Sequence, residues 1–223
     1  AVKVLLRLNA CVSPDGRKVA FAALGELYLM PVGDPPVRLT DDLFVDTDPS
    51  FSPDGKWLTY ASDRGGSMDI WVREARAGGA VRRLTENPTL DVAPAFSPDG
   101  KRIAFVAING LFSGEIQTVD LSTGAITKVH DTVFGPSEPQ WSADGSRILF
   151  ASLKRYSERF REGINQFVSV PVAGGADVTW TALPHRGPDT RAGGGPACRS
   201  PCPACSRSRS RRARTSSTRA SPA

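Results

Sequence analysis

The chain has 223 residues, 40% of them hydrophobic and 23% charged, which is enough to build the core of a soluble globular domain. No run of about 18 apolar residues occurs, so the composition excludes a membrane-spanning helix. The net charge of +5 is unevenly distributed, because residues 198–223 hold seven arginines and no acidic residue. Residues 1–197 keep 21 of the 28 basic residues against 23 acidic ones, and this formal charge of −2 argues against a nucleic-acid footprint.

A Ser-Pro-Asp-Gly tetrapeptide, or its Ser-Ala-Asp-Gly variant, occurs four times along the chain. Its serine falls at positions 13, 52, 97 and 142, with steps of 39, 45 and 45 residues. The triplet "RLT" at 38–40 returns at 83–85, and "KVH" stands in the same phase at 128–130. A period of about 40–45 residues built from short strands is typical of β-propeller blades.

We therefore expect four blades in chain order, at about residues 1–40, 41–85, 86–130 and 131–187. The third unit shows the pattern most clearly, with alternating apolar residues that predict strands at 93–97, 101–107, 114–121 and 125–130. No unit shows helical periodicity. The predicted fold class is all-β, a partial β-propeller of about four four-stranded antiparallel blades over residues 1–187, followed by a disordered C-terminal tail at 188–223.

The repeated tetrapeptide predicts the turn between the first and second strands of each blade. Proline presets φ, aspartate bonds back to the local backbone, and glycine accepts the positive φ that closes the hairpin. The expected turn residues are Pro14, Asp15, Gly16, Pro53, Asp54, Gly55, Pro98, Asp99, Gly100, Asp144 and Gly145. The aromatic residue before the turn, at Phe51, Phe96 and Trp141, is expected to pack between neighbouring blades.

The fourth unit contains an insertion at 153–166, "LKRYSERFREGINQ", which we expect to form a solvated excursion above the blade. Loops on a rigid scaffold often carry recognition, and the alternative is a loop packed on its own propeller. The candidate partner contacts are Arg155, Tyr156, Arg159, Phe160 and Arg161.

The C-terminal segment changes composition where a further blade is expected. From about residue 198 it consists mainly of Arg, Ser, Pro, Ala and Cys, and we hypothesise a frame-shifted reading of the coding sequence. Cys198, Cys202 and Cys205 resemble half of a zinc site without a fourth ligand. The run "RSRSRR" offers a basic tail for nucleic acid, the least favoured of the functional alternatives.

The sequence contains no recognisable set of catalytic, metal-binding or cofactor-binding residues. His130 and His185 are the two histidines, and neither belongs to a His-x-His metal motif; His130 is expected at the end of a blade strand. The Gly-x-Ser-x-Gly nucleophile elbow is missing too. Four carboxylates in "DDLFVDTD" (41–48) fit no calcium-loop spacing, so turn bonding is favoured there over metal binding.

The stretch "PSFSPDGKWLTYASDRGGSMDIWVREARAGGAVRRLT" (49–85) resembles a TolB-like, WD-like propeller repeat. Three segments, "SDRGGSMDIWVR" (62–73), "LKRYSERFREGINQF" (153–167) and "LPHRGPDTRAGGGPA" (183–197), are similar to the propeller half of exported bacterial proteins in which a TolB-like domain precedes a metal-dependent amidohydrolase barrel. The resemblance implies a periplasmic or exported protein. It also implies a divalent metal such as zinc only in a catalytic barrel that these residues do not contain.

Two functions remain open at this point. The first is a non-catalytic propeller module, a piece of an exported hydrolase, that binds a protein partner or gates an adjoining catalytic domain. The second is part of a metal-dependent amidohydrolase acting on C–N bonds. Because the chain begins at Ala1 without a charged-then-apolar leader, we expect no signal peptide within it. We also expect aggregation or non-cooperative melting, since an incomplete propeller exposes blade faces and strand edges.

Overall fold

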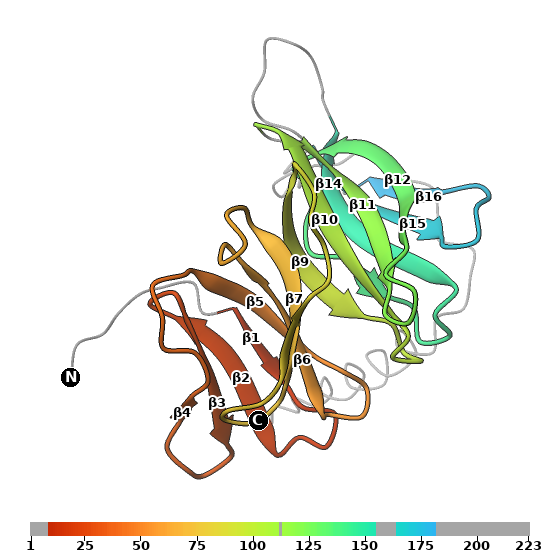
Figure 1. Ribbon diagram of the computed structural model, residues 1–223. Coiled ribbons are helices and arrows are strands. Elements are labelled where there is room, and N and C mark those ends of the chain that lie inside the picture. The colour runs from red at the N-terminus through yellow and green to blue at the C-terminus, as the bar shows by residue number, and fades with distance from the viewer. Residues whose placement is uncertain (1–8, 112, 155–163, 182–223) are drawn as a thin grey trace, which may run out of the picture. The chain divides into compact units, whose positions relative to one another are not determined.

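The computed structural model describes residues 9–111, 113–154 and 164–181. The chain divides into two compact units, Ala1–Pro184 and His185–Ala223, and every described residue belongs to the first. The described residues form sixteen strands and no helix, in four antiparallel four-stranded sheets that are the blades of a propeller (Figure 1). The predicted fold class is therefore confirmed. The predicted tail at 188–223 lies outside the described residues.

Each blade is an antiparallel meander whose strand order is the order in the chain. Blade 1 contains β1 (Ala10–Val12), β2 (Lys18–Ala23), β3 (Glu26–Pro31) and β4 (Val37–Arg38). Blade 2 contains β5 (Asp46–Phe51), β6 (Trp57–Ser62), β7 (Asp69–Glu74) and β8 (Val81–Arg83). Blade 3 contains β9 (Leu90–Phe96), β10 (Arg102–Gly110), β11 (Ser113–Asp120) and β12 (Ile126–Phe134). Blade 4 contains β13 (Gln140–Trp141), β14 (Arg147–Lys154), β15 (Ile164–Pro171) and β16 (Val178–Thr181).

The insertion in blade 4 is shorter than the sequence predicted. β14 continues to Lys154 and β15 begins at Ile164, and these two residues pair across the ladder. Residues 153–154 and 164–166, which we predicted to be part of the excursion at 153–166, therefore belong to paired strands. The part between them, including Arg155, Tyr156, Arg159, Phe160 and Arg161, lies outside the described residues.

The structure places all four repeated tetrapeptides in the turn between the first and second strands of a blade. In blade 3 the Ser97 hydroxyl donates to the Asp99 carboxylate at 2.6 Å and accepts the N–H of Arg102 at 2.9 Å. Gly100 has φ +68°, the left-handed conformation that glycine adopts without strain. The serine–aspartate bond recurs at 2.6 Å in every blade, so the same local bonding closes each hairpin.

The triplet "RLT", at the end of blades 1 and 2, forms hydrogen bonds and ion pairs with the third strand of its own blade. The Thr40 hydroxyl accepts the N–H of Leu27, and Thr85 does the same for Ile70, each at 2.9 Å. The arginines pair with the first residue of the third strand, at 2.5 Å for Arg38–Glu26 and 2.7 Å for Arg83–Asp69. In blade 3 the equivalent pair is Lys128–Glu115 at 4.0 Å. The two RLT triplets therefore form the same ion pair and the same hydroxyl bond in blades 1 and 2.

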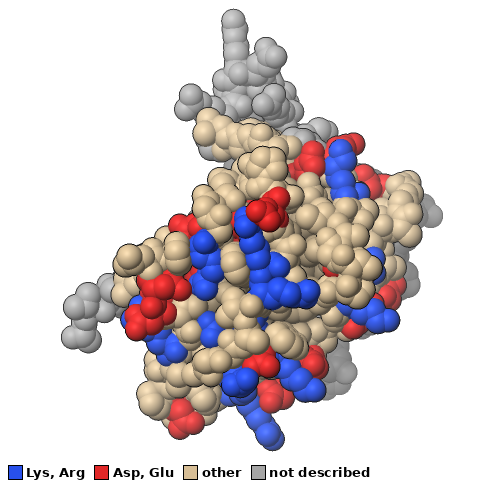
Figure 2. All heavy atoms as spheres, viewed as in Figure 1, with Lys and Arg blue, Asp and Glu red and all other residues tan. Residues whose placement is uncertain are grey.

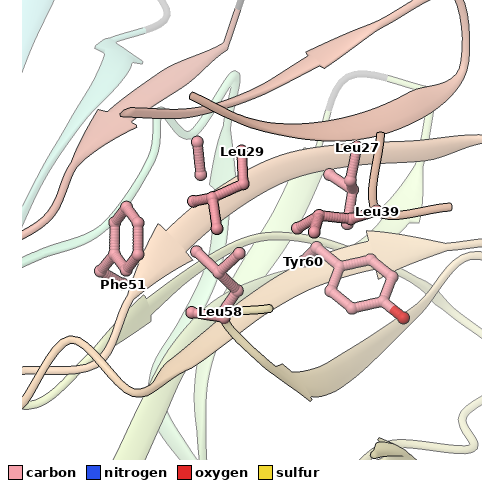
Figure 3. Packing of buried hydrophobic residues seen from close by; sticks show 8 residues of the cluster. Leu27, Leu29, Leu39, Phe51, Leu58 and Tyr60 are labelled. Carbon is pink, nitrogen blue, oxygen red and sulfur yellow. The ribbon is translucent and has the colours of Figure 1, made fainter. Parts of the chain in front are cut away.

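The core consists of apolar layers between consecutive blades. The first layer joins blade 1 to blade 2, and in Figure 3 Leu27, Leu29, Leu39, Phe51, Leu58 and Tyr60 lie between the strands of the two blades. The next layers join Ile70 of blade 2 to Phe105 of blade 3, and Val106 of blade 3 to Phe150 of blade 4. Each of the three aromatic residues before the turns packs into one of these layers, as expected. A blade thus depends on its neighbours for burial.

Candidate functional site

The first strands of all four blades line one pocket of about 550 Å³, here called the first-strand pocket. Its lining includes four residues at the same position of the repeat, which keep the 39-, 45- and 45-residue steps: Asn9, Asp48, Ala93 and Glu138. Pro49, Pro94 and Pro139 follow three of them directly. The lining includes Trp141 and Gln140 but no lysine or arginine, so its formal charge is negative. The spacing of the repeat places these four residues at equivalent positions, but their residue types differ from one copy to the next.

Asp48 bridges three blades at the mouth of this pocket. Its carboxylate accepts hydrogen bonds from the Asn9 side-chain amide of blade 1 and from the N–H of Ala93 in blade 3, the latter at 3.3 Å. Asp48 and Ala93 both have φ +53°, and both adjoin a register shift in their strand pairing. A positive φ at a non-glycine residue is strained and persists only where the surroundings hold it. The pocket therefore has a fixed backbone frame.

Glu138 presents an exposed carboxylate to the pocket, and no ion pair is found for it among the described residues. Trp141 is held in place because its indole N–H donates to the carbonyl of Ala95 at 3.0 Å. Cys11 also lines the pocket, where burial raises the pKa of its thiol to about 11. The thiol is therefore protonated at neutral pH and is a poor nucleophile. These groups can bind a positively charged ligand but form no nucleophilic set.

The acidic stretch at 41–48 forms an ion-pair network. Carboxylate oxygens of Glu26, Asp42 and Asp46 lie within 4.8 Å of one another. The Arg64 guanidinium donates to both oxygens of Asp46 at 2.9 Å and lies 3.4 Å from Asp42. Arg38 supplies the second positive charge, to Glu26. Two guanidinium groups thus pair with these carboxylates, and the turn-bonding interpretation did not include these ion pairs.

Burial and pairing act in opposite directions on the two buried carboxylates of this network. Burial raises the pKa of Asp46 and outweighs the bonds from Ser62 and Arg64. At Glu26 burial also opposes ionisation, but the hydrogen bonds from Thr40 and Arg38 together have the larger effect, and the pKa of Glu26 is lowered. Asp46 is therefore costly to keep ionised and depends on Arg64.

His130 lies in β12, the last strand of blade 3, but in the middle of that strand and not at its end as expected. Its Nδ1 is 2.8 Å from the Asp131 carbonyl, and its Nε2 lies 3.2 Å from the Asp177 carboxylate. His185 and the three cysteines at 198, 202 and 205 lie outside the described residues. No second histidine accompanies His130 in the described part of the chain.

Comparison with solved structures places the chain among known propellers. It resembles a TolB protein from Agrobacterium tumefaciens at 26% identity and a TM-score of 0.65, covering 77% of this chain and 63% of that one. TolB from Acinetobacter baumannii matches with the same identity and TM-score, over 79% of this chain and 43% of that one. The chain is a TolB-like β-propeller. It spans less than two thirds of the length of either TolB chain.

The tricorn protease shares the fold at 16% identity and a TM-score of 0.57, and this TolB-like propeller covers 18% of that chain. Puromycin hydrolase matches at 17% identity and a TM-score of 0.60, with 29% of its chain covered. At these identities only the fold is shared, so no catalytic residue transfers. No family model matches the chain.

We expect Arg64→Met to lower the free energy of unfolding by about 3 kcal/mol, because it leaves the buried Asp46 carboxylate without its cation. Urea denaturation at neutral pH measures this loss. The double variant Arg64→Met/Asp46→Asn should recover a large part of it, because no charge then remains buried. Equal stabilities of the single and double variants would contradict this assignment.

A second prediction concerns Asp91, which is fully buried and accepts bonds from Asn87 and Thr89 at 2.9 Å. Burial raises its pKa above the unfolded value of 3.8. As the pH rises through about 4, the unfolded state therefore loses this proton first, and stability falls. We expect the free energy of unfolding of the unsubstituted protein, minus that of Asp91→Asn, to decrease between pH 3 and pH 7. A difference that is constant over this range would contradict the prediction.

Proposed function

We propose that this chain is a non-catalytic propeller module that binds a segment of a protein partner in the first-strand pocket. The observation that carries the proposal is that one position of the repeat supplies a pocket-lining residue from each of the four blades. Asp48 fixes this arrangement by joining three blades through its carboxylate. A pocket assembled from several blades is a recurrent place for recognition on a rigid scaffold.

The charge of the lining favours a basic peptide segment as the ligand. Asp48 and Glu138 are acidic, and Asn9 and Gln140 present amides. A lysine or arginine side chain pairs with carboxylates and donates hydrogen bonds to amide oxygens. The Trp141 ring already has a cation beside it, because the Arg102 guanidinium lies 5.1 Å from the ring centroid. Figure 2 shows that acidic and basic side chains are interspersed on the face in view.

We expect a fluorescently labelled peptide rich in Lys and Arg to bind, and its Glu-rich counterpart not to bind. Fluorescence anisotropy measures both affinities. Glu138→Gln should weaken binding of the basic peptide about fivefold, since an exposed charge pair contributes up to about 1 kcal/mol. Binding should also weaken with added salt.

The matched control is Glu86→Gln, which removes the same charge at an exposed position outside the pocket lining. This variant should bind the basic peptide as tightly as the unsubstituted chain does. Equal affinity for the basic and acidic peptides, or equal losses in the two variants, would contradict the proposal.

The alternative proposal is that the module belongs to a metal-dependent amidohydrolase whose metal and catalytic barrel lie outside these residues. What supports it is the motif resemblance and the presence of this propeller fold in larger peptidases. Amide hydrolysis that a chelator abolishes, shown by a longer protein that joins this propeller to such a barrel and not by this chain alone, would favour this alternative. We further propose an exported, periplasmic location, from the likeness to TolB proteins. The described residues contain no helix that is long and apolar enough to cross a membrane.

A further inference from the structure

One third-strand position differs in exposure between blade 4 and the other three blades. In every blade this third-strand residue pairs with the second-strand residue that comes nine positions after the turn serine. In blades 1 to 3 it is Leu27, Ile70 and Ile116, with exposures of 1%, 0% and 0%. In blade 4 it is Phe167, which is 52% exposed. The face of blade 4 that corresponds to three buried faces is therefore open among the described residues.

A groove on this face corresponds to one half of a groove between two blades. The groove between blades 2 and 3, of about 490 Å³, is lined by Ser52, Trp57 and Val72 of blade 2. The equivalent residues of blade 4, Ser142, Arg147 and Ser169, line a groove of about 480 Å³ together with Leu149 and Phe167. Blade 3 supplies the other wall of the first groove through Phe96, Asp99 and Leu121. Within the described residues, no fifth blade supplies that wall in the second groove.

Blade 1 presents the complementary face. Val12 is 61% exposed, whereas its equivalent Phe51 in blade 2 is 8% exposed. Phe21 is partly exposed, and its ring stacks on Tyr28 of its own blade with ring centroids 5.3 Å apart. Its equivalents Tyr60, Phe105 and Phe150 are at most 1% exposed, because a preceding blade covers each of them. The two open faces are thus the two halves of the interface that the chain already forms three times.

The turns show the same difference between contacts within the chain and the open faces at its two ends. A Cβ built on Gly55, Gly100 or Gly145 would lie 3.6 Å from the proline Cδ of the preceding turn, at Pro14, Pro53 and Pro98 respectively. A Cβ on Gly16 would meet nothing within 4 Å, and Ala143, which holds the proline position in blade 4, is exposed. In the groove between blades 2 and 3, Trp57 of blade 2 and Asp99 of blade 3 line the same space. The residue of blade 4 equivalent to Trp57 is Arg147, and the residue of blade 1 equivalent to Asp99 is Asp15. Apposition of the open faces would therefore bring opposite charges together.

We propose that a second copy of this chain docks head to tail, with its blade 1 on the open face of blade 4. The interface continues the register of the three interfaces within the chain, so it needs no new type of packing. It is heterologous, because different faces of the two copies meet. The four described blades of each copy leave one open face at either end, so a heterologous contact of this kind can repeat from copy to copy.

The test is the mass in solution, measured by sedimentation velocity over a range of protein concentrations. The unsubstituted chain is expected to form dimers and longer species as its concentration rises. Phe167→Glu and Val12→Glu each place a carboxylate in the head-to-tail junction, and each should raise the dimer dissociation constant about 100-fold. Leu43→Glu is the matched control, since Leu43 is fully exposed and lies on neither face, and it should leave the dimer unchanged.

An equimolar mixture of the Phe167→Glu and Val12→Glu variants identifies the head-to-tail geometry. One junction of the mixed pair keeps both native faces, so the mixture should form heterodimers at concentrations where each variant alone is monomeric. Circular dichroism establishes that both variants remain folded β proteins, as expected for exposed positions. A monomeric unsubstituted chain at all concentrations would overturn the proposal. So would a dimer that survives either substitution, or a mixture that fails to associate.

Discussion

Burial of each blade by the next is the constraint on which the rest of this structure depends. A four-stranded sheet with apolar residues on both faces cannot bury them alone, so its stability comes from stacking. Leu58 and Tyr60 of blade 2 are covered by blade 1, while Ile70 on the opposite face is covered by blade 3. The local turn bonds determine the shape of each hairpin. The packing between blades supplies the larger free energy, since about 25 cal/mol is gained for each Å² of apolar surface buried.

The fold could be predicted from the sequence because its main determinants are local and repeated. The turn at Ser97–Gly100 needs only a serine, an aspartate and a glycine at fixed spacing, and the structure shows the same bonds in each copy. Strand limits were less predictable, since ladder pairing continues wherever a partner strand runs alongside. For this reason Lys154 and Ile164 pair inside the segment that we predicted to be an excursion.

The candidate site was not predicted because its residues share a position in the repeat but not a residue type. Asn9, Asp48, Ala93 and Glu138 carry no common chemical motif, and only stacking of the blades brings them to one pocket. The positive φ of Ala93 gave no sequence signal, since alanine rarely adopts it. For the acidic stretch at 41–48 the sequence favoured loop and turn bonding over metal binding, and the ion pair of Asp46 with Arg64 became apparent only in three dimensions.

The most direct test of the account uses the aromatic position that each blade carries in its second strand. Phe105 is buried beneath blade 2, whereas Phe21 is partly exposed. The measurement is the free energy of unfolding of Phe105→Ala and Phe21→Ala, at concentrations where the chain is monomeric. The account predicts a loss of about 3–5 kcal/mol for Phe105→Ala, the usual cost of emptying a core aromatic site, and less than half of that for Phe21→Ala. Equal losses at the two positions would contradict the claim that neighbouring blades stabilise one another.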